Sequence, residues 1–290
     1  MITKQRPSLR FLLFATPLMA GSAFVAAPGW AATLAKSEAT VELNKFSHSP
    51  VEVEAFTETF TEIFTSSSEV TADADAFAEF TADPSPKKTS AFNFSLSKIE
   101  GEGKSYFGQV KSVAGVIGYN FLVNAGQTFS FDFSAFLGLE TSIDEPEVEY
   151  ASASGEVNFQ LYNTQNNKDT KNWIPLDFFS LAGKVKTLES GDFLAYEKSA
   201  NVTVKPNKVF LETSFGGNEE TAEAFIKGKF SRTFDSLTYL TLVETKTNKV
   251  KASKAIAETP EFSSTLALLL FCLIGVGYEA RNKAVAVKSK

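Results

Sequence analysis

Apolar and polar residues alternate one by one through most of the middle of this chain. A period of two places alternate side chains on opposite faces of a β-strand, whereas long stretches with helical periodicity are nearly absent. The clearest alternating runs are Phe129-Phe131-Phe133-Ala135-Leu137-Leu139, Val157-Phe159-Leu161 and Val202-Val204. The pattern predicts antiparallel strands that each have one buried and one solvated face.

Three further segments also indicate strands. Phe92, Phe94 and Leu96 alternate with Asn93, Ser95 and Ser97, which predicts an inward apolar face and an outward polar face. Residues 51–64 could place their phenylalanines on one helical face, but the dense threonines favour an extended strand. Residues 71–81 alternate alanines with larger or charged residues and predict a flat strand with a face of small side chains.

Turn residues separate several of these runs. Asn124–Gln127 and Pro206–Asn207 each lie between two alternating segments, and short connections of this type predict β-hairpins. The chain contains 28 phenylalanines and 2 tryptophans, which suits a core of rings that need no hydrogen-bond partner. The expected fold is an all-β antiparallel sandwich, jelly-roll-like or immunoglobulin-like, with its topology left open.

The amino end predicts a secretory signal peptide. Lys4, Arg6 and Arg10 precede an apolar stretch from Phe11 to Ala27, and small residues then surround Ala31. We expect a signal helix that signal peptidase cleaves after Ala31. An uncleaved membrane anchor is the alternative interpretation.

The carboxyl end contains a second apolar segment. Residues from Leu266 to Gly277, including Leu270 and Leu273, form a run that is shorter than the roughly 17–25 residues of a comfortable membrane span. Pro260 suits the first turn of a helix, and Arg281 begins a basic end. We predict a short transmembrane helix, with a buried core helix as the alternative.

This tail resembles the PEP-CTERM sorting signal of exported bacterial proteins. The similarity consists of Pro260-Glu261, a short hydroxyl-rich spacer, the apolar segment and the basic end, about the last thirty residues in all. It departs from the family pattern at Phe262, where a second proline is usual, and at Glu279, which interrupts the basic residues. The resemblance implies recognition by an exosortase and delivery to the cell surface or extracellular matrix. The body is similar to uncharacterised exported proteins with such tails, and this similarity implies no activity.

These features divide the chain into four parts: a signal peptide (1–31), an exported sandwich domain (32–245), a lysine-rich linker (246–257) and a sorting tail (258–290). The whole chain has 28 basic and 34 acidic residues. The two ends hold 7 and 3, so residues 32–257 carry 28 − 7 = 21 basic and 34 − 3 = 31 acidic residues, a net charge of −10. This acidity argues against nucleic-acid binding. Cys272, the only cysteine, lies in the tail, so no intrachain disulfide forms.

Candidate catalytic chemistry is sparse. The single histidine, His48, lies in a turn-like segment, and no nucleophile–base set accompanies it, so we expect no enzymatic activity. Acidic clusters occur at Asp73 with Asp75, at Asp144-Glu145 with Glu147 and Glu149, and at Glu219-Glu220 with Glu223. Solvated surface is the favoured interpretation of these clusters, with calcium binding or paired glycosidase acids as alternatives.

Aromatic residues near predicted loops offer another kind of site. Tyr162, Trp173 and Tyr196 could stack on sugar rings, although packing roles are the simpler interpretation. The sequence therefore predicts a non-catalytic exported protein of the cell envelope, surface or extracellular matrix. The alternative is a carbohydrate-binding or glycan-active sandwich, with calcium dependence left open and no other cofactor expected. The expected partners are the secretion machinery, signal peptidase, an exosortase, the membrane and extracellular polysaccharide.

Overall fold

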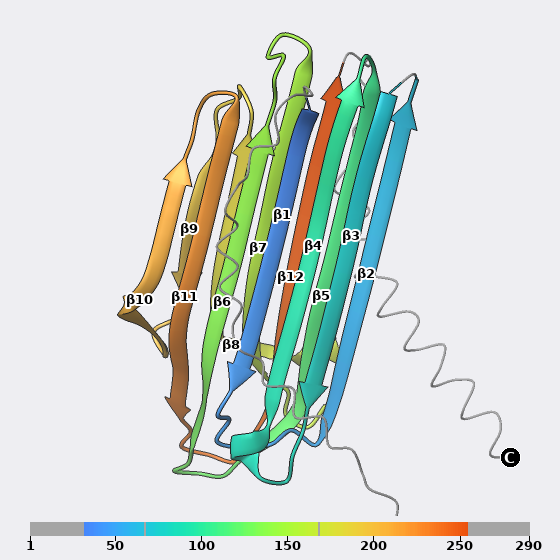
Figure 1. The fold of residues 1–290 in the computed structure, drawn as a ribbon. Helices are drawn as coiled ribbons and strands as arrows, with labels where there is room; N and C mark the ends of the chain where they lie inside the picture. The colour runs from blue at the N-terminus through green and yellow to red at the C-terminus, as the bar shows by residue number, and fades with distance from the viewer. Residues whose placement is uncertain (1–31, 67, 168, 255–290) are drawn as a thin grey trace, which may run out of the picture. The chain divides into compact units, whose positions relative to one another are not determined.

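The computed structural model describes residues 32–66, 68–167 and 169–254, and this part of the chain is built from long β-strands (Figure 1). Two short 3-10 turns, η1 (Pro86–Lys88) and η2 (Thr170–Asn172), interrupt the connections. The strands are β1 (Ala32–Asn44), β2 (Glu52–Thr65), β3 (Ser68–Thr81), β4 (Ser90–Gly103), β5 (Tyr106–Val123), β6 (Thr128–Ser142), β7 (Glu149–Asn163), β8 (Ile174–Lys186), β9 (Phe193–Lys198), β10 (Val202–Ser214), β11 (Glu219–Thr233) and β12 (Thr238–Lys254). The predicted all-β class is confirmed, and so are the strands expected at 51–64 and 71–81.

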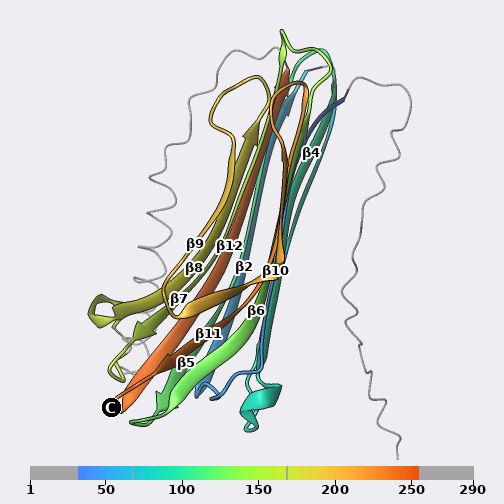
Figure 2. The same cartoon turned by 90° about the vertical axis from the view of Figure 1, so that its left-hand side faces the viewer.

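The strands form two six-stranded antiparallel sheets that lie face to face (Figure 2). The first, which we call sheet A, has the order β10-β11-β6-β1-β4-β3. The second, sheet B, has the order β2-β5-β12-β7-β8-β9. Each sheet therefore has two edge strands, β10 and β3 in sheet A and β2 and β9 in sheet B.

Most connections carry the chain from one sheet to the other. Only β3–β4, β7–β8, β8–β9 and β10–β11 are consecutive strands paired within one sheet of the described chain. The hairpin predicted at Asn124–Gln127 is wrong, because β5 belongs to sheet B and β6 to sheet A. Gly126 does take a turn conformation, with φ +78, but its N–H donates to the carbonyl of Phe234. Turn residues report a reversal of direction and do not specify which sheet receives the next strand.

The hairpin predicted at Pro206–Asn207 is also wrong. β10 continues through both residues, and its register against β11 shifts between Val204 and Val209. Proline cannot donate to a β-ladder, so within a sheet it is tolerated at an edge strand or a bulge. β10 is an edge strand with an irregular register at this point, so Pro206 fits both conditions.

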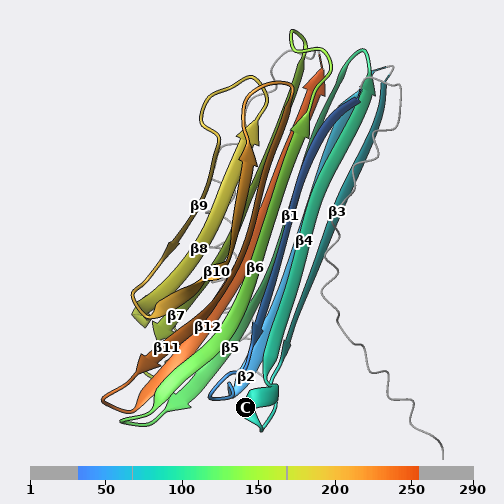
Figure 3. The same ribbon diagram turned by 60° about the vertical axis from the view of Figure 1, so that its left-hand side comes forward.

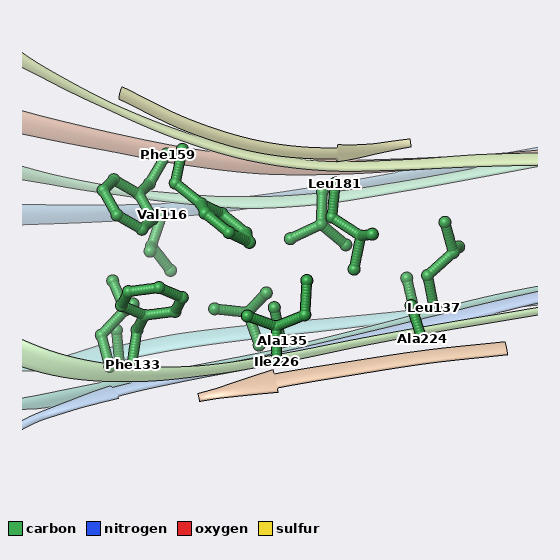
Figure 4. Close-up of a cluster of buried hydrophobic side chains, with 14 of the residues drawn as sticks. Val116, Phe133, Ala135, Leu137, Phe159, Leu181, Ala224 and Ile226 are labelled. Carbon is green, nitrogen blue, oxygen red and sulfur yellow. The ribbon is translucent and has the colours of Figure 1, made fainter. Parts of the chain in front are cut away.

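The core lies between the two sheets (Figure 4). Phe133, Ala135 and Leu137 of β6 point toward Phe159 of β7 and Leu181 of β8. Rings pack across the gap, with centroids 5.3 Å apart for Phe131 and Phe159 and 4.8 Å apart for Phe133 and Phe179. The alternating runs that begin at Phe129 and Val157 therefore bury their apolar faces as predicted.

β4 reverses the predicted orientation. Its polar residues Asn93, Ser95 and Ser97 are buried between the sheets, whereas Phe92 points outward and is 43% exposed. The inward polar groups find partners from other strands, such as the 3.0 Å hydrogen bond between the Ser97 and Ser112 hydroxyls. Alternation defines the two faces of a strand, but the facing sheet decides which one is buried.

The last strand corrects the predicted linker. Residues 246–254 belong to β12, which pairs with β5 on one side and β7 on the other. Its lysines alternate between the interior and the outer face, and Lys246 is fully buried. The sandwich therefore extends to Lys254 instead of ending at residue 245.

No helix within residues 32–66, 68–167 and 169–254 is long and apolar enough to cross a membrane. The predicted signal helix with its cleavage site at Ala31, the sorting motif at Pro260, Glu261 and Phe262, and the apolar segment with Leu266, Leu270, Leu273 and Gly277 lie outside the described residues.

Candidate functional site

A row of phenylalanine side chains crosses the outer face of sheet A. Directly paired residues in neighbouring antiparallel strands point to the same face, so the strand register defines this row. From one edge of the sheet to the other it runs Phe210, Phe225, Phe136, Thr40, Phe94 and Phe77. We call these six residues the phenylalanine row, and Figure 3 shows the strands that carry them side by side.

The phenylalanine row is open to solvent at both ends. Phe77 on β3 is 48% exposed, and Phe210 on β10 is 45% exposed. Phe92 on β4 widens the apolar surface, with its ring centroid 6.1 Å from that of Phe77. The Nζ atom of Lys227 lies 4.9 Å from the centroid of the Phe225 ring, which places a cation over one ring of the row.

Carboxylates border one side of the phenylalanine row. The next row of paired outward residues is Asp75, Leu96, Glu38, Gly138, Glu223 and Glu212. Extended apolar surface with a polar rim is characteristic of interaction sites. The arrangement can accommodate a flat apolar partner and favours one with basic groups at its margin.

A second aromatic cluster lies on the outer face of sheet B. The ring of Trp173, just after η2, has its centroid 5.4 Å from Tyr162 on β7 and 6.3 Å from Tyr119 on β5. We call these three residues the tyrosine–tryptophan patch. Two predicted sugar-stacking residues, Tyr162 and Trp173, are thus brought together. The third is not, because Tyr196 packs toward the core, with its ring 6.3 Å from Phe179.

The polar atoms of the tyrosine–tryptophan patch already have protein partners. The Trp173 Nε1–H donates to the carbonyl of Asn167 at 3.0 Å, and the Tyr119 hydroxyl donates to Glu54 at 2.9 Å. The Tyr162 hydroxyl donates to Gln160 at 2.5 Å, and burial raises the pKa of Tyr162. The indole therefore ties Asn167 to the start of β8, while the half-buried rings retain an accessible part that could stack on a ligand.

The acidic clusters lie at different kinds of position. Asp73 and Asp75 point outward from β3 and are exposed. Glu219 and Glu223 share the outer face of β11, whereas Glu220 is buried and accepts a hydrogen bond from the Gly216 N–H at 2.8 Å. Among the residues that the structure describes, no group of three or more acidic, histidine or cysteine side chains is placed to hold a metal ion.

Glu149 organises the cluster around residues 144–149. Its carboxylate accepts hydrogen bonds from the backbone N–H groups of Asp144 at 2.8 Å and Glu145 at 3.0 Å. Lys254 lies 3.1 Å from Glu149 and 2.9 Å from Glu145, so an ammonium group pairs with two carboxylates of this cluster. Burial opposes ionisation of Glu149, but these donors together lower its pKa.

His48 lies between β1 and β2, as expected for a turn residue. Its Nδ1 atom is 2.9 Å from the Ser47 hydroxyl, and its Nε2 atom is 3.2 Å from Gln127 Oε1. Its ring centroid is 6.1 Å from that of Phe129. These contacts tie the segment to β6.

A buried polar cluster between the sheets was not predicted. Lys246 and Glu244 on β12 form an ion pair at 3.1 Å with both side chains completely buried, and Asn93 of β4 donates to the same carboxylate. Burial raises the pKa of Glu244 and lowers that of Lys246, and in each case the partner opposes the shift. Asn248 extends the cluster through a 2.8 Å bond from the Ser37 hydroxyl and a 2.7 Å bond to the Ser95 carbonyl.

The sequence did contain a signal for this cluster. Glu244, Lys246 and Asn248 occupy the same period-two face as Leu242 and Val250, which are both buried. The phenylalanine row had no comparable signal, because it depends on the register among six strands, and three of their five pairings join strands that are not consecutive in the chain. Compared with known proteins, the chain matches no protein-family model, no curated protein and no solved structure.

Proposed function

We propose that this chain is a non-catalytic, exported protein of the cell surface or extracellular matrix. It is sorted or anchored through residues 258–290, and its jelly-roll-like or immunoglobulin-like sandwich lies outside the cytoplasm. The signal peptide ending at Ala31 directs export through the secretion machinery, and an exosortase recognises the tail around Pro260, Glu261 and Phe262. The short apolar segment at Leu266–Gly277 holds the chain in the membrane before processing.

The phenylalanine row is the observation that carries this proposal. An acidic domain that displays phenylalanines on five of the six strands of one sheet has a surface suited to adhesion. The carboxylates beside the row favour contacts with basic and apolar matrix components. The proposed role requires neither enzymatic activity nor a cofactor.

The sorting step is tested by deleting Pro260–Lys290 in native host cells. We expect the truncated protein to move from the envelope fraction into the medium or to stall during export. Mass spectrometry of the two ends of the native protein should show an amino terminus at Ala32 and a processed carboxyl terminus. Unchanged cell attachment after the deletion would overturn the anchoring role.

The adhesive role is tested separately on the middle of the phenylalanine row. A Phe94→Ser, Phe136→Ser and Phe225→Ser variant should still be exported but should be washed from the matrix more easily. A matched control changes outward polar residues on the same three strands, with Lys98→Ser, Ser134→Thr and Lys229→Ser. Equal retention of the two variants would show that the row is not the adhesive surface.

A carbohydrate-binding module is the second candidate, favoured by the tyrosine–tryptophan patch. Exposed parts of aromatic rings can stack on sugars, and Tyr119, Tyr162 and Trp173 converge from three separate segments. The full chain in detergent should be applied to a glycan array with and without calcium. Binding that Trp173→Ala abolishes and Trp173→Tyr preserves would support this candidate. Absence of binding to every glycan on the array would exclude it.

A further inference from the structure

The two edges of sheet A differ in charge and run in opposite directions. β3 hydrogen-bonds to β4 and β10 hydrogen-bonds to β11, and no strand of the described chain pairs with the far side of either. All neighbours in this six-stranded sheet are antiparallel, so its first and last strands point in opposite directions. A copy of the chain displaced sideways, without inversion, would therefore bring its β10 antiparallel to β3.

We propose that copies of this chain assemble head to tail, with β3 of one copy pairing with β10 of the next. The inference rests on the proposed function as a surface or matrix component and identifies a partner, a second copy, that such a component would bind. A heterologous contact of this kind repeats from copy to copy and builds an open chain unless rotation closes it into a ring. Unpaired edge strands provide the backbone groups for such pairing.

The charge of the edges favours pairing of unlike edges. β2 and β3 lie at one side of the two sheets and contain no lysine or arginine, while their acidic residues are Glu52, Glu54, Glu58, Glu62, Glu69, Asp73, Asp75 and Glu79. β9 and β10 lie at the other side and carry Lys198, Lys205 and Lys208 against Glu197 and Glu212. Two acidic edges would repel each other, whereas an acidic edge and a lysine-bearing edge attract.

Apolar side chains are exposed where the copies would meet. Phe77 lies on β3, and Phe210 and Leu211 lie on β10, where Leu211 is 43% exposed although it shares the inward register of Ala224. A neighbouring copy would cover these side chains. Exposed apolar residues on an unpaired edge are a recognised route to strand-to-strand association.

The phenylalanine row sets the register of this contact. It ends at Phe77 on one edge and at Phe210 on the other, so pairing these two residues continues the row from copy to copy. In that antiparallel register, Asp75 lies opposite Glu212, and Lys208, just before the regular part of β10, comes near Glu79 at the margin of the contact. Pro206 and the register shift after Val204 limit regular pairing on β10 to Val209–Ser214, so the contact is short and depends on concentration.

The first experiment uses the full chain in non-ionic detergent and sedimentation velocity over a range of concentrations. The average mass of the wild type should rise with protein concentration and pass the mass of a dimer without levelling off. Phe77→Lys or Phe210→Lys should weaken association by at least about tenfold, because each places a charge in the contact between β3 and β10 of neighbouring copies. Phe94→Lys, on an interior strand of the same row, should associate as the wild type does. Glu212→Lys should strengthen association about threefold by removing the like-charged pair with Asp75.

Mixing distinguishes head-to-tail assembly from a symmetric dimer. The Phe77→Lys variant retains an intact β10 edge, and the Phe210→Lys variant retains an intact β3 edge. An equimolar mixture should therefore form dimers and nothing larger. A wild type that stays monomeric, or a Phe210→Lys variant that self-associates as strongly as the wild type, overturns the proposal. Equal association of all variants would also overturn it, because all share the same apolar tail.

Disulfide trapping gives a second readout that does not depend on weakened variants. Phe77→Cys and Phe210→Cys are introduced together in a Cys272→Ser chain. Five strand spacings separate the two positions within one chain, about 24 Å, so an intrachain bridge cannot form. Oxidation should produce a ladder of dimers, trimers and higher species, and a Phe94→Cys, Phe225→Cys control should not. Absence of the ladder overturns the edge contact, whereas the adhesive and sorting roles are judged by the separate retention and fractionation experiments.

Discussion

At the residue scale, the most costly arrangement is the ion pair between Glu244 and Lys246. Both side chains are removed from water, and Asn93 contributes a hydrogen bond to the carboxylate while its own Oδ1 atom has no hydrogen-bond partner. Charges pay a desolvation penalty inside a protein that their mutual attraction only partly offsets. Removing one partner therefore destabilises the fold by more than the intact pair stabilises it.

We expect the single substitutions Glu244→Gln and Lys246→Met to destabilise the fold by about 3–5 kcal/mol each, because each leaves a buried charge unpaired. The double variant should recover most of this loss, since both charges are gone and the amide can still accept from Asn93. Urea unfolding monitored by circular dichroism measures all three free energies. Lys251→Met, which removes an outward lysine from the same strand, should change stability little. A double variant as unstable as the sum of the singles would contradict the coupling.

Protonation of Glu149 should contribute to the loss of folding stability at acid pH. Its pKa in the folded protein lies below the ordinary value of 4.5, so the unfolded chain binds its proton first as the pH falls. The stabilisation is therefore complete above about pH 4.5 and is lost as the pH falls through the lower folded pKa. Unfolding measured from pH 6 to pH 2 should show a shallower acid loss for Glu149→Gln than for the wild type. An unchanged slope would show that Glu149 is not linked to folding in this range.

At the element scale, strand existence was predictable and strand placement was not. The alternation at Phe129–Leu139 and Val157–Leu161 gave correct buried faces because both sides of the core there are apolar. At β4 the same rule failed, since Ser112 and Asn248 offer polar partners to the serines of that strand and Glu244 accepts a hydrogen bond from its Asn93. At β10 a proline was compatible with a continuing edge strand, and at β12 lysines alternated into the interior. These outcomes depend on the opposite sheet, which a local pattern cannot contain.

The approach of the two sheets depends on Gly155 in β7. A methyl group added there would lie 2.8 Å from Asn248 Oδ1 and 2.9 Å from Ser37 Oγ, closer than ordinary carbon contacts. Gly155→Ala should therefore cost about 1–3 kcal/mol through overpacking and disturbance of the buried polar cluster. Gly138→Ala is the matched control, because its added methyl would meet only the Phe136 ring, at 3.1 Å, on the outer face of β6. Equal thermal stability of the two variants would contradict this account.

At the scale of the whole molecule, the sequence predicted an acidic all-β sandwich but neither of its aromatic surfaces in full. Tyr162 and Trp173 were identified as candidates, while Tyr119 was missed because nothing local in the sequence brings this residue of β5 near Trp173. The phenylalanine row needs one residue from each of six strands, and the register among these strands is set by tertiary structure. The two faces of a strand can be predicted from its own sequence, but a row of residues across several strands can be predicted only when the register of the sheet is known.

Assembly through the edges should weaken in sodium chloride. The acidic edge and the lysine-bearing edge attract through solvent-exposed charges, and the screening length falls from roughly 10 Å at 0.1 M salt to about 3 Å at 1 M. Sedimentation velocity should show a smaller average mass at the higher salt concentration for the wild type. Glu212→Lys, which adds a further charge to the attraction, should show a steeper decline. A mass that increases with sodium chloride would indicate association through apolar surface alone.

β12 lies between β5 and β7 near the middle of sheet B and continues in sequence directly into the carboxyl-terminal tail. Tension on an anchored tail would thus enter the sandwich along the axis of an interior strand. Interstrand hydrogen bonds in antiparallel sheets run perpendicular to that axis, so such a load shears two ladders together and does not peel them open one bond at a time. If residues 258–290 anchor the chain as proposed, the load would therefore enter the sandwich where it can best resist being pulled apart by flow or by moving neighbours.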